Sequence, residues 1–151
     1  MLPVKLILCP TDFSEPAGQC VEAATELAKF FNAELLLVNV VPAIPNLPPD
    51  PNYVYKIPEF ERYLHADAEK HLGEVLIQVS AKGIRARTQV GHGPAAEEIV
   101  TIAKAENADL IVIATHGATG WERLMFGSVA EKVVRLAECP VLTVRKAVAS
   151  S

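Results

Sequence analysis

The residue types best suited to holding a ligand are concentrated in residues 114–128, which include His116, Gly117, Gly127 and Ser128. An apolar run, residues 110–113, precedes this segment, and residues with helical periodicity follow it. Glycines let a backbone approach an anion closely, and the N–H groups at the start of a helix point toward it. The segment therefore predicts a loop that binds phosphate groups.

The spacing of the glycines excludes the two commonest nucleotide-binding motifs. Nine residues separate Gly117 from Gly127 and Ser128, which fits neither G-x-G-x-x-G nor G-x-x-x-x-G-K-[ST]. A plainer interpretation stays open, because Ser128 and Glu131 fit the capping box S-x-x-E and glycines can serve only in turns. The length of the loop and its His and Thr content favour anion binding.

Two further candidate positions follow the first two apolar runs of the chain. Asp12 ends the sequence Pro10-Thr11-Asp12 and could accept hydrogen bonds from ribose hydroxyls or an amino group. Asp12 could instead cap the next helix, as its residue type favours; Ser14 can serve as that cap, so both interpretations of Asp12 stay open. Val40 could pack against a flat base, or it could belong only to the core.

Short apolar runs alternate with stretches of helical periodicity along the chain. Such alternation predicts a parallel sheet covered by helices on both faces, with ligands beyond the carboxyl ends of the strands. The expected strands are residues 6–9, 34–41, 84–90, 110–114 and 141–145, and the expected helices follow Ser14, Pro58, Pro94 and Gly127.

The region between Pro42 and Pro58 contains six prolines with those two included, so a helix there is excluded and a long loop or lid is expected. Pro58 is well placed to open a helix. Its buried stripe is expected to run from Phe60 through Leu72 to Val79.

Composition limits the class of protein. With 151 residues the chain is expected to form one domain, residues 1–151, and its content of 50% hydrophobic but 6% aromatic residues indicates an aliphatic core. A formal charge of −4 argues against partners such as nucleic acid or an anionic membrane. Three cysteines without a C-x-x-C motif, and no long apolar run, predict a cytoplasmic protein.

No group of residues has the spacing of a metal site or of a known catalytic motif. His65 and His71 are six residues apart, a poor spacing for binding one ion, and Cys9 and Cys20 lack further ligands. His116 could donate to a phosphate or be solvated. We therefore expect no protein-held metal and no catalytic residues.

The candidate positions together resemble the universal stress protein family over the whole chain. Residues 126–134 are similar to the segment that follows that family's phosphate loop. The pattern of its ATP-binding branch is G-x-x-G, nine residues, G-[ST], and Gly117, Gly127 and Ser128 fit it. Ala114 replaces the first glycine, and it continues the apolar run as an extended residue would.

The resemblance implies an α/β fold: an open, Rossmann-like sheet of five parallel strands in the order 3-2-1-4-5, with helices on both faces. It implies that ATP, with ADP or AMP as alternatives, binds together with Mg²⁺. The residues around the nucleotide would be Pro10, Thr11, Asp12, Val40, Ala114, His116, Gly117, Gly127, Ser128 and Val129.

The function expected from the resemblance is that of an ATP-binding regulatory protein of the stress response, read by unknown protein partners. It would form a homodimer through residues 141–145, and any ATP hydrolysis would be slow and incidental. Two alternatives stay open: an ATP-dependent enzyme that activates a small substrate, and an interaction module without a nucleotide.

Overall fold

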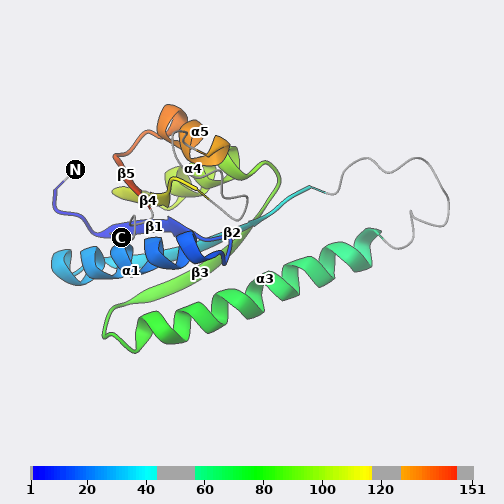
Figure 1. The fold of residues 1–151 in the computed structure, drawn as a ribbon, viewed down its shortest axis with the longest axis horizontal. Coiled ribbons are helices and arrows are strands. Elements are labelled where there is room, and N and C mark those ends of the chain that lie inside the picture. Colours follow the sequence, from blue (N-terminus) through cyan, green and yellow to red (C-terminus); the bar gives the residue numbers. More distant parts are fainter. Residues whose placement is uncertain (1, 44–56, 117–126, 146–151) are drawn as a thin grey trace, which may run out of the picture.

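The apolar runs form one parallel sheet in the computed structural model, which describes residues 2–43, 57–116 and 127–145. The strand order is β3-β2-β1-β4-β5, so the expected fold class and order are confirmed (Figure 1). The strands are β1 (Leu6–Pro10), β2 (Glu34–Val41), β3 (Ala86–His92), β4 (Leu110–Ala114) and β5 (Val141–Val144).

Four described helices cover the sheet, α1 and α3 on one face and α4 and α5 on the other (Figure 1). As expected, the Ser14 hydroxyl caps α1 by accepting from the Ala17 N–H at 3.3 Å, and Asn32 ends α1 in the left-handed conformation. The helices are α1 (Glu15–Phe31), α3 (Ile57–Ser80), α4 (Ala95–Ala105) and α5 (Ser128–Leu136). No helix among the described residues is long and apolar enough to cross a bilayer.

The central strands are buried on both faces, so alternate residues of each strand belong to different cores. In β1, Ile7 and Cys9 pack under α1 and α3, whereas Leu6 and Leu8 pack under α4 and α5. Leu8 is paired in register with Leu36 of β2 and Ile111 of β4. Such two-sided burial explains why these strands are apolar throughout instead of alternating with polar residues.

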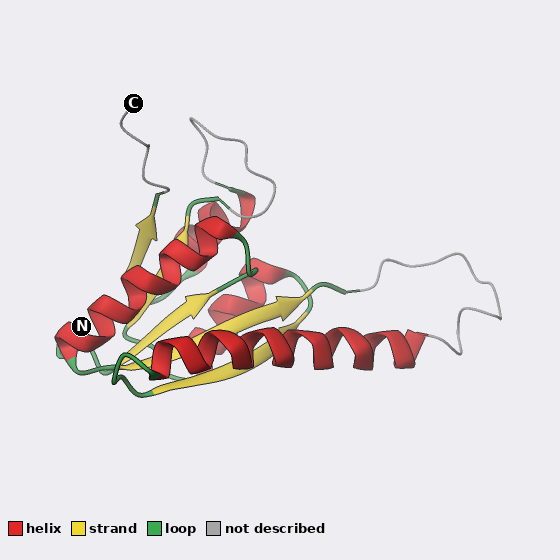
Figure 2. Ribbon diagram, turned by 60° about the horizontal axis from the view of Figure 1, so that its bottom comes forward, coloured by secondary structure: helices red, strands yellow, loops and turns green. Residues whose placement is uncertain are grey.

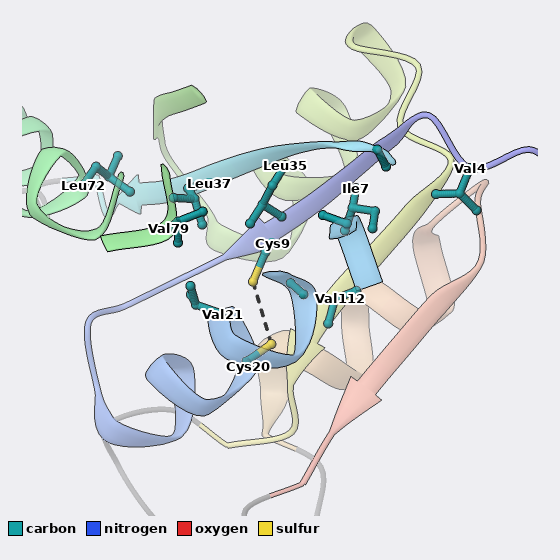
Figure 3. Close-up of a cluster of buried hydrophobic side chains, with 13 residues drawn as sticks. Val4, Ile7, Cys9, Cys20, Val21, Leu35, Leu37, Leu72, Val79 and Val112 are labelled. Atoms are coloured by element: carbon teal, nitrogen blue, oxygen red, sulfur yellow. Dashed lines mark hydrogen bonds between the residues drawn. The ribbon is translucent and has the colours of Figure 1, made fainter. Parts of the chain in front are cut away.

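Cys9 and Cys20 lie in the core between β1 and α1, and both are fully buried (Figure 3). Their Sγ atoms are 3.8 Å apart, within reach of a thiol hydrogen bond. That hydrogen bond, burial and the nearby Cys20 thiol raise the pKa of the Cys9 thiol well above its usual value. The two side chains therefore act as small apolar groups of the core.

The third strand lies two residues further along the chain than expected, at Ala86–His92 instead of 84–90. It continues through Gly91 and His92, which pair with Val40 and Val41 of β2, and the turn comes at Gly93 with φ of 115°. Gly91 lies close against α4, since a Cβ there would stand 2.7 Å from Glu98 Cγ. Pairing with β2 and this close approach explain a glycine inside the strand.

The buried stripe expected on α3 is wrong at its first position. Leu72 is completely buried and Val79 nearly so, but Phe60 is 50% exposed. The first turns of α3 project past the end of the strands, so no sheet lies beneath Phe60 (Figure 2). The expected lid, between Pro42 and Pro58, falls mostly on residues 44–56, outside the described residues.

Substitutions at the two ends of α3 should therefore differ in cost. Leu72→Ala should lower the free energy of unfolding by about 2–5 kcal/mol, because it leaves a cavity in the core. Phe60→Ala should change it by no more than about 0.5 kcal/mol. Urea unfolding followed by circular dichroism measures both, and equal losses would contradict the placement of α3.

Candidate functional site

The carboxyl ends of β1, β2 and β4 surround a hollow of about 290 Å³, bordered by the starts of α1, α4 and α5. This is the edge of a parallel sheet at which ligands bind in open α/β folds. Its described lining is Pro10, Thr11, Asp12, Ala17, Val38, Asn39, Val40, Ala95, Ile99, Ile113, Ala114, Thr115, His116, Gly127, Ser128, Val129 and Ala130.

Nine of the ten residues predicted for the nucleotide thus border one hollow. They are Pro10, Thr11, Asp12, Val40, Ala114, His116, Gly127, Ser128 and Val129. The tenth, Gly117, lies outside the described residues, as do the other residues of 117–126. That these residues bind a ligand stays a prediction.

Backbone hydrogen bonds fix the turn between β1 and α1. The Thr11 N–H donates to the Val38 carbonyl at 2.8 Å, and the Asn39 side-chain amide donates to the Thr11 carbonyl at 2.8 Å. Phe13 has a positive φ of 65°, which is uncommon for a bulky residue, and its N–H donates to Thr11 Oγ1 at 3.1 Å. These contacts hold Asp12 at the mouth of the hollow.

Asp12 serves the helix as well as lining the hollow. Its Oδ1 accepts hydrogen bonds from the Ser14 backbone N–H, at 3.0 Å, and from the Ser14 hydroxyl. Ser14 is thus the capping residue, as expected, and Asp12 contributes by holding Ser14 in place. A carboxylate has two oxygens and about four acceptor positions, so this role and a ligand contact are compatible.

Val40 belongs to the core, as one of its two interpretations had it, and also borders the hollow. It is half-buried, packs against the core beneath α4 and α5, and borders the hollow beside Val38. An apolar wall of this kind can contact a flat ring.

The glycine-containing loop is closed at its base by one short hydrogen bond. Ala114 ends β4 as an ordinary extended residue paired with Val144, as expected, and the Thr115 N–H continues the ladder to the Val144 carbonyl at 3.0 Å. The Gly127 N–H then donates to the Thr115 carbonyl at 2.6 Å. Residues 115 and 127 are thus joined directly, although eleven residues separate them.

The start of α5 offers groups that no other described residue uses. Gly127 is the capping residue and provides no side-chain hydrogen bond, so Ser128 opens the helix and the capping box does not form. Within the described residues the Ser128 hydroxyl makes no hydrogen bond, and Ser128 lines the hollow. The N–H groups of a first helical turn have no intrahelical partner and favour an anion.

His116 presents a buried nitrogen at the same place. Its Nδ1 lies 3.0 Å from the Thr115 hydroxyl, which is 3.4 Å from the Val144 carbonyl. Its Nε2 is buried without a hydrogen-bond partner among the described residues. Buried polar atoms are normally paired, so an unpaired one at the edge of a hollow indicates a partner yet to be supplied.

Sequence reasoning missed two polar residues of the hollow. Thr115 is 2% exposed and links His116 to β5, and Asn39 fixes the Thr11 carbonyl. Asn39 had a signal, since it is the one uncharged polar residue of an otherwise apolar strand. Nothing in the sequence singled out Thr115, because its contact to Val144 depends on the pairing of β4 with β5.

Comparison with known proteins identifies the family. The sequence pattern described as the universal stress protein family matches residues 3–145. The chain belongs to the universal stress protein family. Universal stress protein MJ0531 of Methanocaldococcus jannaschii is 36% identical over 144 residues, which covers 94% of this chain and 82% of the relative. Universal stress protein YxiE of Bacillus subtilis is 33% identical over 144 residues, covering 92% of this chain and 97% of the relative.

Solved structures of the family share the fold. Universal stress protein UspA from Lactobacillus plantarum superposes with a TM-score of 0.82 at 25% identity, covering 94% of this chain and 98% of the other. A universal stress protein in complex with cAMP is 22% identical, with a TM-score of 0.67 and coverage of 95% and 98%. One from Archaeoglobus fulgidus in complex with dAMP is 19% identical, with the same TM-score and coverage.

Glycine at position 127 is needed by the loop itself, whether or not a ligand binds. A Cβ there would stand 2.9 Å from the Thr115 carbonyl oxygen, closer than real contacts allow. Gly127→Ala should lower the free energy of unfolding by about 1–3 kcal/mol, because the loop must shift. The matched control is Gly73→Ala in α3, where a Cβ meets nothing within 4 Å; it should stabilise by about 0.5–1 kcal/mol. Chemical denaturation of both variants tests this, and an unchanged stability of Gly127→Ala would show that the loop does not close in this way.

Proposed function

We propose that this universal stress protein binds an adenine nucleotide, ATP first among them, in the hollow at the carboxyl ends of β1, β2 and β4. One observation carries the proposal: hydrogen-bonding groups that have no partner among the described residues converge there from two segments. They are the Ser128 hydroxyl, the first N–H groups of α5 and His116 Nε2.

These groups suit a polyphosphate. Helix N–H groups, a hydroxyl and an imidazole nitrogen can all donate to phosphate oxygens, and the helix dipole favours negative charge at this end. Nearby N–H groups compensate the cost of removing an anion from water. Mg²⁺ would then be held mainly by the phosphates and water, as that ion prefers.

The other wall suits a nucleoside. Val38, Val40 and Ile99 provide apolar surface for a base, while the exposed Asp12 stands at the mouth, where ribose hydroxyls could donate to it. The hollow of 290 Å³ is close to the lower end of the usual range for ligand sites, roughly 300–1,000 Å³.

The solved structures with cAMP and dAMP support this only as examples of the same fold, since their identity to this chain is 22% and 19%. The argument for this chain therefore depends on its own residues. ADP or AMP could take the place of ATP, because all share the adenosine and at least one phosphate.

We propose a regulatory role in the stress response, with the nucleotide state read by partner proteins, and not catalysis. The titratable residues of the described lining are Asp12 and His116, and each already has a hydrogen bond to a neighbour, Ser14 or Thr115. An enzyme that activates a small substrate would release pyrophosphate rapidly when ATP and that substrate are present. The reduced, buried thiols of Cys9 and Cys20 fit a cytoplasmic location.

Ser128→Ala tests the phosphate contact without disturbing the fold. Because the Ser128 hydroxyl has no protein partner in the described structure, its loss should leave the free energy of unfolding unchanged. A hydrogen bond to a charged group contributes about 1.5–3 kcal/mol, so ATP affinity should fall roughly tenfold or more. Calorimetric titration measures it, with Ser80→Ala at the end of α3 as the control. Unchanged affinity in Ser128→Ala, or no binding by the natural chain, would overturn the proposal.

We also propose a homodimer formed through β5. This strand is the edge of the described sheet, and edge strands have backbone groups that can pair with another chain. Leu142 of β5 is 43% exposed, and α5 beside it exposes Val134 at 47% and Leu136 at 42%. A two-fold axis at this edge would cover these apolar side chains.

Leu142→Asp should convert the dimer to a monomer, since it places charges opposite each other across the axis. Val144 is a poorer target because it packs against the core beneath α1. Phe30→Asp is the control, an exposed apolar residue of α1 at 81%. Sedimentation velocity at micromolar concentration decides the matter; a monomeric natural chain, or a Leu142→Asp dimer, would contradict this interface.

A further inference from the structure

Two histidines far apart in the sequence face each other outside the hollow. His65 lies in α3 and His92 is the last residue of β3, and His65 Nδ1 is 2.9 Å from His92 Nε2. Their ring planes are within 8° of each other. Glu69, one turn further along α3, places its Oε1 3.0 Å from the other nitrogen of His65, Nε2. None of the three residues borders the candidate nucleotide hollow.

The protons of this group can be assigned from its partners. A carboxylate only accepts, so the Glu69 contact holds the proton of a neutral His65 on Nε2 and leaves a lone pair on Nδ1. That lone pair points at His92 Nε2, which donates to it in the metal-free protein. His92 is exposed and its Nδ1 has no hydrogen-bond partner among the described residues, so its proton can move to Nδ1, where water accepts it. Each of the two facing nitrogens then has a lone pair available to an ion.

We propose that His65 and His92 bind a divalent transition-metal ion, with Glu69 as the outer-sphere carboxylate. Imidazole nitrogens suit Zn²⁺, Ni²⁺ and Cu²⁺, and bonds of roughly 2.0–2.1 Å to two adjacent positions at right angles place the nitrogens about 2.9 Å apart. A carboxylate that accepts from the second nitrogen of a ligating histidine is the usual support of such a ligand.

The site has two protein ligands and open positions. Among the described residues no set of three or more His, Cys, Asp or Glu side chains is arranged to hold an ion, so water completes the coordination. The right-angled spacing favours Ni²⁺ and Cu²⁺ over tetrahedral Zn²⁺. The His65 side chain is 40% exposed, which gives an ion direct access from solvent.

The ion would join α3 to β3, the strand that follows it in the sequence. It would fasten the projecting half of α3 to the carboxyl end of β3. A ligand that binds only the folded state raises the unfolding temperature, so bound metal should stabilise the protein measurably.

His71 provides a matched control on the same helix. Its side chain is 41% exposed against 40% for His65, and it too contacts a carboxylate four residues away, Asp67. It faces the Phe13 ring instead of a second imidazole. If exposure on α3 were enough for a histidine to bind the ion, His71 would bind it as well as His65 does.

The experiment is a calorimetric titration of the full chain with NiCl₂, after treatment with a chelator and removal of any affinity tag, together with thermal melts. We expect one ion per chain and a higher unfolding temperature. His65→Asn and His92→Asn should each abolish both effects, and His71→Asn should retain them. Glu69→Gln should weaken binding by about 10–100-fold, as loss of an outer-sphere partner does.

Three results would overturn the proposal. They are the absence of Ni²⁺ binding, binding that persists in His65→Asn or His92→Asn, and an equal loss in His71→Asn. Circular dichroism of each variant shows that the fold is intact, which is expected because all three histidines are at least partly exposed.

Discussion

Burial of β1 on both faces is the constraint from which most of this structure follows. Leu6, Ile7, Leu8 and Cys9 are all buried, and no polar side chain can be placed on either face without losing its hydrogen bonds to water. Polar residues are therefore displaced to the ends of the strand. At the carboxyl end, the residues that follow Pro10 and those that follow β4 meet the last residues of β2, and together they surround one hollow.

The hollow and the edge strand are connected by a short series of contacts. The Gly127 N–H binds the Thr115 carbonyl, the Thr115 N–H binds the Val144 carbonyl, and the Thr115 hydroxyl lies between His116 Nδ1 and that same carbonyl. An anion that orders the start of α5 would act on residues one hydrogen bond away from β5. The proposed ligand site and the proposed dimer edge are thus physically adjacent, as the proposed regulatory role requires.

The starts of α1 and α5 explain the roles of Asp12 and Ser128, which the sequence left open. Asp12 and Ser14 are joined in one cluster at the start of α1, so Asp12 contributes to capping and also borders the hollow. Ser128 has no capping role, because Gly127 takes the capping position through its backbone alone. The same residue types therefore do different things at two helix starts, and the difference lies in the backbone of the preceding turn.

The strand order and most of the nine residues that meet at the hollow followed from the resemblance to the universal stress protein family. The pattern of the residues by itself determined the fold class and the edge of the sheet where a ligand site was expected. It could do so because two-sided burial makes strands apolar throughout, and because a parallel sheet brings the ends of β1, β2 and β4 to one edge. Only the tertiary structure decided the exposure of Phe60, the part of Thr115 and the contact of His65 with His92. Each depends on how one element is placed relative to another: α3 extends past the ends of the strands, β4 pairs with β5, and β3 ends beside α3. Local sequence patterns contain the period of an element but not its position beside its neighbours.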